Sequence, residues 1–399
     1  MKIIAFLVGV TLAAAASFSQ SLAKEPPKSL PIAAPPQASS LHDYGNHLDH
    51  IEVWCSLETR CDIQRYVQQM GVCALYVIKQ RTVRVELYHK SEICEGGKND
   101  IDKMYGVASM AKSLTSTLLG QALAEKYHLR TRAQFQAIMQ RSVGSFLELR
   151  NRMTLAESYS TVSLDHLLSM RSDIQWRESY RPAMLSDSIA FDNQVRTPPR
   201  KRSLIGFASR YRPTRHRAAR FNYSALDSAM AIAVARDLSP LRPLNAFEKG
   251  VWSMVGAAHS ASWNVDVNGD PIGPCCFKAR IDDLARFGDF VLHKGQGKRI
   301  PAAWFDLTTA PLESRFNGLE DESDRAEDSC KLGYGYYWWL RKKRPDYFAY
   351  GRYGQFIHIY PKDNVVIIQM SDWNAIPVGD HARCVALKTH DAIVNGLRR

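Results

Sequence analysis

A Ser-x-x-Lys pattern occupies residues 109–112 of the stretch Tyr105-Gly106-Val107-Ala108-Ser109-Met110-Ala111-Lys112-Ser113, which opens the strongest predicted helix, residues 109–126. Positions i and i+3 share one helix face, so the Lys112 amine can reach the Ser109 hydroxyl. The first turn of a helix also offers unpaired N–H groups to a developing oxyanion. A lysine that is desolvated there has a lowered pKa and can act as a base. The pattern therefore indicates nucleophilic catalysis by Ser109.

The Ser-x-x-Lys pattern is common by itself. A second copy, from Ser21 to Lys24, occurs by chance, and Ser109 alone could be a helix N-cap. Competing nucleophile systems are absent from the sequence, because it contains neither a Gly-x-Ser-x-Gly elbow nor a His-Glu-x-x-His motif. An α/β-hydrolase and a zinc protease are therefore disfavoured.

The sequence on either side of this helix predicts an α+β fold, an antiparallel β-sheet flanked by helices with an inserted, mainly helical region. Alternation over residues 72–88 predicts a β-hairpin, and helices dominate the middle of the chain, for example at 164–170 and 225–236. Strands return at residues 334–340, 347–350, 356–360 and 365–370, before a helix over 380–397. We therefore expect a sheet built from about residues 70–108 and 334–399, with the helical region at about 109–330.

The N-terminal residues predict export. Met1 and Lys2 precede a short apolar run, residues 3–16, and the small residues of Ser21-Leu22-Ala23, a pattern typical of a cleaved secretory signal. We expect a signal peptide at 1–23, cleaved near Ala23, a proline-rich linker at 24–50 and a single hydrolase domain at 51–399. An uncleaved anchor is the alternative. No later stretch is apolar enough for a transmembrane segment, so the expected location is periplasmic or secreted.

The eight cysteines favour disulfides, because their number is even and the chain is predicted to be exported. Sequence neighbours suggest the pairs Cys55–Cys61 and Cys73–Cys94. Cys275 and Cys276 are adjacent in the sequence, which favours a separate partner for each of them. A zinc site is disfavoured because no Cys-x-x-Cys occurs.

Three further blocks accompany the Ser-x-x-Lys stretch: Leu164-Asp165-His166-Leu167-Leu168-Ser169-Met170-Arg171-Ser172-Asp173, Arg220-Phe221-Asn222-Tyr223-Ser224-Ala225-Leu226-Asp227-Ser228 and Tyr350-Gly351-Arg352-Tyr353-Gly354-Gln355. With them the sequence resembles the serine β-lactamase and penicillin-binding-protein-like superfamily, over about residues 70–395. The class C β-lactamase, esterase and 6-aminohexanoate-dimer hydrolase branch is the most similar. The resemblance implies a β-lactamase/transpeptidase-like fold, a serine hydrolase, and chemistry that needs no metal or organic cofactor.

The resemblance also implies roles for individual residues. Ser109 would be the acylated nucleophile, Lys112 its base, and Tyr223 would exchange protons with Ser109 and the leaving group. The backbone N–H groups of Ser109 and Arg352 would form the oxyanion hole. The expected substrate-binding residues from these motifs are Tyr180, Gly351, Gly354 and Gln355. Tyr223 could instead be a core aromatic residue, and the two glycines a strand-end turn.

Two departures from the family pattern narrow the expected substrate. The family's Tyr-x-Asn motif is Tyr223-Ser224-Ala225 here, without the asparagine, and the third motif has no lysine. In β-lactamases and D,D-peptidases, that lysine helps to hold the substrate carboxylate. Its loss disfavours antibiotic hydrolysis and peptide trimming, and the remaining residues are more similar to those of the esterase and oligoamide-hydrolase branch.

Positive charge is concentrated in residues 196–220. The chain has a formal net charge of +12, and this segment holds nine Lys or Arg residues and no acid. Nucleic acid is disfavoured as a partner because no nucleic-acid fold or stacking pattern accompanies the charge. A solvated loop is one interpretation. The other is that Arg217 and Arg220, close to Tyr223, bind an anionic or glycan-linked acyl substrate.

The sequence therefore predicts an exported serine hydrolase that acts on an ester or amide through an acyl-enzyme. A transacylase, which would pass the acyl group to an envelope or small-molecule acceptor, is the first alternative. The second is an inert binder of an anionic polymer, because fold alone does not establish catalysis.

Overall fold

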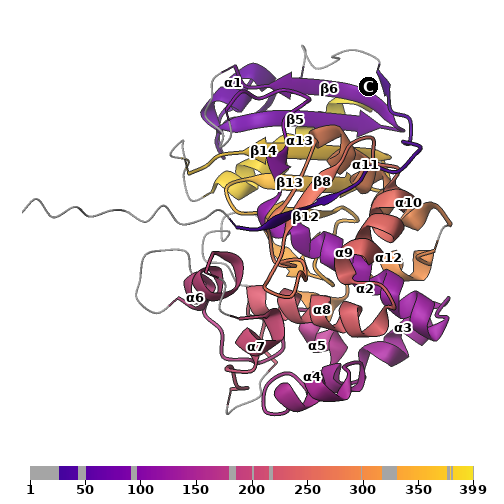
Figure 1. Ribbon diagram of the computed structural model, residues 1–399. Helices are drawn as coiled ribbons and strands as arrows, with labels where there is room; N and C mark the ends of the chain where they lie inside the picture. The colour runs from indigo at the N-terminus through magenta and orange to yellow at the C-terminus, as the bar shows by residue number, and fades with distance from the viewer. Residues whose placement is uncertain are drawn as a thin grey trace, which may run out of the picture.

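The computed structural model describes residues 27–43, 51–90, 97–178, 186–199, 202–214, 219–297, 299–316, 330–374, 378 and 381–398. Figure 1 shows a β-sheet with helices packed on it in the upper half of the molecule and a mainly helical region below. The predicted α+β fold is confirmed.

The main sheet has eight strands in the order β10-β11-β12-β13-β14-β5-β6-β2. Strand β14 pairs antiparallel with β5, so that Ile367 lies opposite Val77 and the two ends of the chain build the sheet together. The predicted hairpin is present as β5 and β6. The strand bounds are β2 His42–Asp43, β5 Val72–Lys79, β6 Thr82–Tyr88, β10 Leu332–Tyr334, β11 Trp339–Arg341, β12 Tyr347–Gly351, β13 Gln355–Tyr360 and β14 Val365–Ser371.

Both faces of the central strands are buried. Leu75 and Val77 of β5 belong to a core with helices α1 (Ile63–Gln69) and α13 (Ala382–Gly396). Tyr76 and Ile78 point to the other face, into the core that contains α11 (Ile281–Leu292). Because alternate side chains leave opposite faces of a strand, double-sided burial requires the nearly continuous apolar sequences of β5, β13 and β14.

Helix α2 (Ala111–Tyr127) belongs to the helical region and is buried over residues 111–124. A helix that is buried on all sides must lie between other elements, and α2 packs on α8 (Ala225–Leu238). The remaining α-helices of the described residues are α3 Arg132–Met139, α4 Leu149–Thr154, α5 Leu164–Leu168, α6 Asp187–Phe191, α7 Leu204–Ala208, α9 Pro243–Ala246, α10 Ser253–Val255 and α12 Ala302–Thr308. None of the helices in the described part of the chain is long and apolar enough to cross a membrane.

A second sheet interrupts the expected helical region. Its order is β1-β8-β9-β7, and β8 and β9 both fall inside residues 109–330. Strand β7 leads into the short helix η1, so this sheet supports the chain immediately before Ser109. The bounds are β1 Ser29–Ile32, β7 Tyr105–Gly106, η1 Ala108–Met110, β8 Ala261–Asn264 and β9 Phe277–Ala279, and a separate hairpin joins β3 Val53–Trp54 and β4 Arg60–Cys61.

Two segments differ from the sequence-based expectation. The single strand expected at 334–340 is wrong, because β10 ends at Tyr334 and a turn, closed by the Gly335 N–H on the Trp338 carbonyl, precedes β11. The only sign of this turn in the sequence is Gly335, which stands within a run of aromatic residues. Within the expected linker, β1 pairs with β8 and Ile32 is fully buried, so these residues pack on the fold. Residues 1–26, which include the predicted signal peptide, lie outside the described residues.

Three disulfides join described cysteines. Cys55–Cys61 is present as predicted, and Cys330 pairs with Cys384. Cys275 and Cys276 pair with each other, which corrects the expectation of separate partners. They share a tight turn between β8 and β9, and a turn of this kind can bring neighbouring side chains together. Cys94, the predicted partner of Cys73, lies outside the described residues.

A buried polar network ties α13 to the sheet. Arg341 on β11 is fully buried and donates to both carboxylate oxygens of Asp391, at 2.7 and 2.8 Å. It also donates to Asp346 at 3.1 Å, and a ring nitrogen of His358 on β13 lies 3.0 Å from the same carboxylate. Buried charges are tolerated when they are paired and hydrogen-bonded, as they are here.

Candidate active site

Ser109 lies in η1, immediately before α2, at the junction of the two sheets and the helical region. The preceding residue, Ala108, has φ +46°, a conformation that side-chain-bearing residues rarely adopt. A neighbouring strand stabilises this turn, because the Val107 N–H donates a hydrogen bond to the Phe277 carbonyl on β9. The end of β12 lies against it: a Cβ on Gly351 would come within 2.7 Å of the Val107 carbonyl oxygen. Only glycine fits this close approach.

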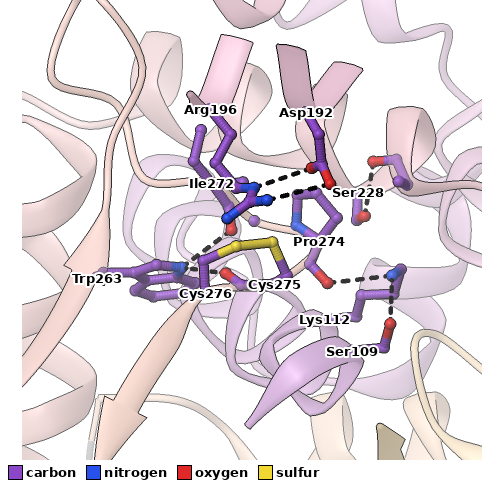
Figure 2. The surroundings of a disulfide bond; sticks show 12 residues. Ser109, Lys112, Asp192, Arg196, Ser228, Trp263, Ile272, Pro274, Cys275 and Cys276 are labelled. Atoms are coloured by element: carbon purple, nitrogen blue, oxygen red, sulfur yellow. Dashed lines mark hydrogen bonds and ion pairs between the residues drawn. A yellow bond between two sulfur atoms is a disulfide. The ribbon is translucent and has the colours of Figure 1, made fainter. Parts of the chain in front are cut away.

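Lys112 is buried and lies directly against Ser109. Its Nζ donates to the Ser109 Oγ at 3.1 Å and to the Pro274 carbonyl at 3.1 Å, as Figure 2 shows. Burial lowers the pKa of Lys112 to about 8, although the negative charges of Glu178 and Asp227 act in the opposite direction. The predicted proximity of Ser109 and Lys112 is therefore present, and with this pKa about one tenth of the amine is uncharged at pH 7 and able to accept a proton.

Tyr223 reaches the same point from the residues just before α8. Its hydroxyl lies close enough to Ser109 for the serine side chain to lower its pKa, and the Lys112 Nζ lies 4.6 Å from its ring centroid. The ring stacks on Trp339, with centroids 5.8 Å apart, and meets Tyr334 edge-on. Burial raises the pKa of Tyr223 above its usual range, so the hydroxyl stays protonated near neutral pH. Tyr223 is therefore packed among aromatic rings and also contacts Ser109.

Two acids near this cluster were not found by sequence reasoning. The Glu178 Oε2 accepts from the Ala225 N–H at 2.9 Å and from the Trp176 indole at 2.6 Å. Asp227 is fully buried and accepts from Tyr159 at 2.7 Å and from Ser172 at 2.8 Å. Burial raises the pKa of Asp227 to about 7. Asp227 belongs to the block at 220–228 but received no role from the sequence, and the only sequence signal of Glu178 is its position two residues before Tyr180.

Comparison with known proteins identifies the family. The sequence model of the β-lactamase family matches residues 62–384. The chain belongs to the β-lactamase family. No curated protein matches it in sequence. The predicted family is therefore confirmed, and so is the predicted enzyme class, because proteins of this family and fold are serine hydrolases.

Solved structures of this family share the fold at low sequence identity. A proposed 6-aminohexanoate-dimer hydrolase from Bacillus anthracis superposes with a TM-score of 0.76 and 18% identity, over 93% of this chain and 92% of that one. EstCE1, a hydrolase with promiscuous acyltransferase activity, has a TM-score of 0.58 and 12% identity, over 82% and 95% of the two chains. A class C β-lactamase has a TM-score of 0.54 and 14% identity, over 82% and 93%.

The third motif of this β-lactamase-family chain lies at the turn between β12 and β13. The Arg352 side chain is exposed, with its guanidinium 4.4 Å from the ring centroid of Tyr353. Gly354 has φ +88° and faces Trp373, and the Gln355 amide donates to the Ser371 carbonyl at 2.9 Å. Gly354 and Gln355 thus have structural partners. The oxyanion role of Arg352 and the substrate contacts of Gly351, Gly354 and Gln355 stay predictions.

The predicted substrate residues of the basic segment are only partly described. Tyr180 and Arg217 lie outside the described residues, and Arg220 is exposed. Arg196 forms a two-point ion pair with Asp192, at 2.9 and 3.1 Å. Two other arginines of the segment, Arg210 and Arg212, line a cavity of about 540 Å³ together with Arg177, Asp187 and Asn222. Asn222, which precedes Tyr223 in the sequence, lines this cavity, whereas Ser109, Lys112 and Tyr223 do not.

One group of described residues has spacing suited to a metal ion: His259, Asp282 and Asp283. The Arg286 guanidinium already pairs with both carboxylates, with Nη1 at 2.5 Å from Asp282 and 3.0 Å from Asp283. The Ala258 and His259 N–H groups also donate to Asp283. These residues do not fit a metal ion, because the Arg286 guanidinium and two backbone N–H groups already occupy the carboxylate oxygens that would bind it.

Proposed function

We propose that the chain cleaves an ester or amide through an acyl-enzyme on Ser109, with Lys112 and Tyr223 moving the protons. The observation that carries this proposal is the 3.1 Å contact between the Lys112 Nζ and the Ser109 Oγ. The lowered pKa of Lys112, about 8, makes it a base suited to this step. The interaction between the Tyr223 hydroxyl and the same serine supports a three-residue centre.

The proposed reaction begins when the uncharged Lys112 amine accepts the Ser109 hydroxyl proton. The Oγ attacks the substrate carbonyl carbon, and the electron pair of the carbonyl bond moves to its oxygen, which the Ser109 and Arg352 N–H groups stabilise. The intermediate then collapses and expels the leaving group, which takes the Tyr223 hydroxyl proton, and the Lys112 ammonium replaces that proton. Water hydrolyses the acyl-enzyme by the reverse sequence and restores Ser109.

Active-site labelling tests this proposal. We expect a fluorophosphonate to add one adduct to the intact protein, and we expect no adduct on the Ser109→Ala variant, because the other described hydroxyls lack a buried lysine partner of this kind. Intact-mass spectrometry measures both. An unlabelled wild-type protein, with circular dichroism showing that it is folded, would contradict the enzyme and favour the inert binder.

For the substrate, we propose an acyl compound that carries a negative charge. The arginines of the cavity beside Asn222 outnumber its one acid, Asp187, and arginine binds carboxylate and phosphate groups with several N–H donors. The ring centroids of Trp339 and Tyr350 lie 6.4 Å apart, and Trp339 stacks on Tyr223. These two rings offer an aromatic surface for the apolar part of the acyl group. The loss of the family's lysine in the third motif supports a different anchor for a charged group.

The proposed negative charge of the substrate can be tested with a matched pair of esters, one neutral and one anionic. At low salt we expect the anionic ester to have a kcat/KM about tenfold higher than the neutral ester, and added salt to reduce that advantage. The Arg210→Gln/Arg212→Gln variant should lose the advantage and keep its activity on the neutral ester. Arg65→Gln, an exposed site on α1, is the matched control and should behave as wild type. Equal rates for both esters at every salt concentration would refute the proposed anionic substrate.

We also propose that the protein acts in the periplasm or after secretion. The disulfides Cys55–Cys61, Cys275–Cys276 and Cys330–Cys384 support this location, because disulfides persist in oxidising compartments. The signal-like pattern of residues 1–23 agrees with it.

A further inference from the structure

The disulfide between the adjacent residues Cys275 and Cys276 lies next to the proposed catalytic base. Figure 2 shows the disulfide directly after Pro274, whose carbonyl faces Lys112. The Lys112 Nζ divides its hydrogen bonds between this carbonyl and the Ser109 Oγ, each at 3.1 Å. The position of the Pro274 carbonyl therefore helps to determine where the amine stands relative to the nucleophile.

The loop that carries Pro274 is seated against α2 and α8. The Thr115 hydroxyl on α2 donates to the Gly273 carbonyl at 3.0 Å. Gly273 itself touches α8, because a Cβ there would come within 2.8 Å of the Ser228 carbonyl oxygen. The loop thus contacts α2 twice, at Thr115 and at Lys112 one turn earlier, and only the second contact reaches the proposed active site.

The disulfide controls the backbone at the end of this loop. A bond between adjacent cysteine side chains closes a small ring that includes the peptide bond between them, and so restricts the soft backbone dihedrals on either side. Cys276 has φ +74°, which residues other than glycine rarely adopt. The Cys275 carbonyl in the same ring accepts from the Trp263 indole at 2.8 Å. Without the ring, Cys276 is free to return to negative φ, and that rotation would move the Cys275 carbonyl and the adjoining Pro274.

We propose that Cys275 and Cys276, through their disulfide, are positioning residues that hold the Pro274 carbonyl and hence Lys112 against Ser109. The proposal rests on the proposed function, in which Lys112 is the base. It implies that a small dithiol weakens catalysis: the dithiol gives two electrons and two protons to the disulfide, becomes oxidised to its own disulfide and leaves two thiols. Both cysteines are partly exposed, so such a reagent can reach them.

The test compares the wild type with Cys275→Ser/Cys276→Ser, using an activated ester and counting active sites with a fluorophosphonate. We expect kcat per active site to fall about tenfold in the variant, because a small displacement of a catalytic group is costly. KM should change less than about twofold, because substrate does not need to touch this loop. Dithiothreitol should lower kcat of the wild type to a similar degree, reoxidation should restore it, and the variant should not respond further.

The variant Cys55→Ser/Cys61→Ser is the matched control, because it removes a disulfide of the separate β3–β4 hairpin. It should keep the wild-type kcat and the wild-type response to dithiothreitol. Unchanged kcat in Cys275→Ser/Cys276→Ser would overturn the inference, and so would a kcat that dithiothreitol still lowers in that variant. The proposed function fails separately, if Ser109→Ala is labelled as readily as the wild type.

Discussion

Lys112→Met should lower the rate of Ser109 acylation by about a thousandfold, the range expected for a general base, while the protein stays folded. Methionine fills much of the same buried volume without a polar end, so the packing of α2 changes little. The Ser109 Oγ, however, loses the amine that stands 3.1 Å away and that is proposed to accept its proton. Stopped-flow measurement with an activated ester gives the acylation rate, and circular dichroism checks the fold.

The same assignment predicts the pH dependence of the wild type. Burial lowers the pKa of Lys112 to about 8, and only the uncharged amine accepts a proton. The value of kcat/KM should therefore rise as the pH rises through about 8, and level off above it. In Lys112→Met, this rise of kcat/KM through pH 8, the acid limb of the profile, should be absent. A wild-type profile that is flat across this range, or an acylation rate in Lys112→Met within about tenfold of wild type, would exclude Lys112 as the base.

The variant Glu178→Gln tests whether the Glu178 charge raises the pKa of Lys112. The Glu178 charge raises the pKa of Lys112 against the larger effect of burial, so its removal should lower that pKa further. The acid limb of kcat/KM should then move to lower pH. The glutamine oxygen can still accept from the Ala225 N–H, which limits the structural change. If the acid limb moved to higher pH instead, the limb would not report the ionisation of Lys112.

Arg341→Met should destabilise the fold by about 3–5 kcal/mol, because it leaves two carboxylates without their buried cation. Arg341 is fully buried, with Asp346 almost as deeply buried and Asp391 accepting from both ends of the guanidinium. Asp346 and Asp391 would keep only the partly exposed Arg344 as a cationic partner, and the attachment of α13 to β11 would weaken. Urea unfolding, followed by tryptophan fluorescence, measures the change in the free energy of unfolding.

Arg344→Met is the matched control for this prediction. Arg344 contacts the same two carboxylates, at 2.9 Å from Asp346 and 2.7 Å from Asp391, but its side chain is 36% exposed. Water screens such a pair, so the cost should stay below about 1 kcal/mol. If the two variants lost equal stability, burial would not be the reason for the strength of the Arg341 pairs.

Local sequence patterns predicted the elements that depend on near neighbours. The Ser109–Lys112 spacing brings two side chains onto one helical face, and alternation over residues 72–88 specifies a hairpin. The turn at 335–338 was missed because the aromatic sequence around Gly335 has no period that marks it. The β1 strand was missed because proline-rich composition is typical of linkers, and its pairing with β8 joins positions more than 200 residues apart.

The sequence by itself therefore determined the fold class, the family and the pairing of Ser109 with Lys112, because each depends on short spacing or on ordered motifs. Only the tertiary structure placed Glu178 against Ala225, Trp339 against Tyr223, and Pro274 against Lys112. It also joined Cys275 to Cys276. These contacts come from how α2, α8, the β8–β9 turn and the sheet pack together, and local periodicity carries no information about packing between segments distant in the chain.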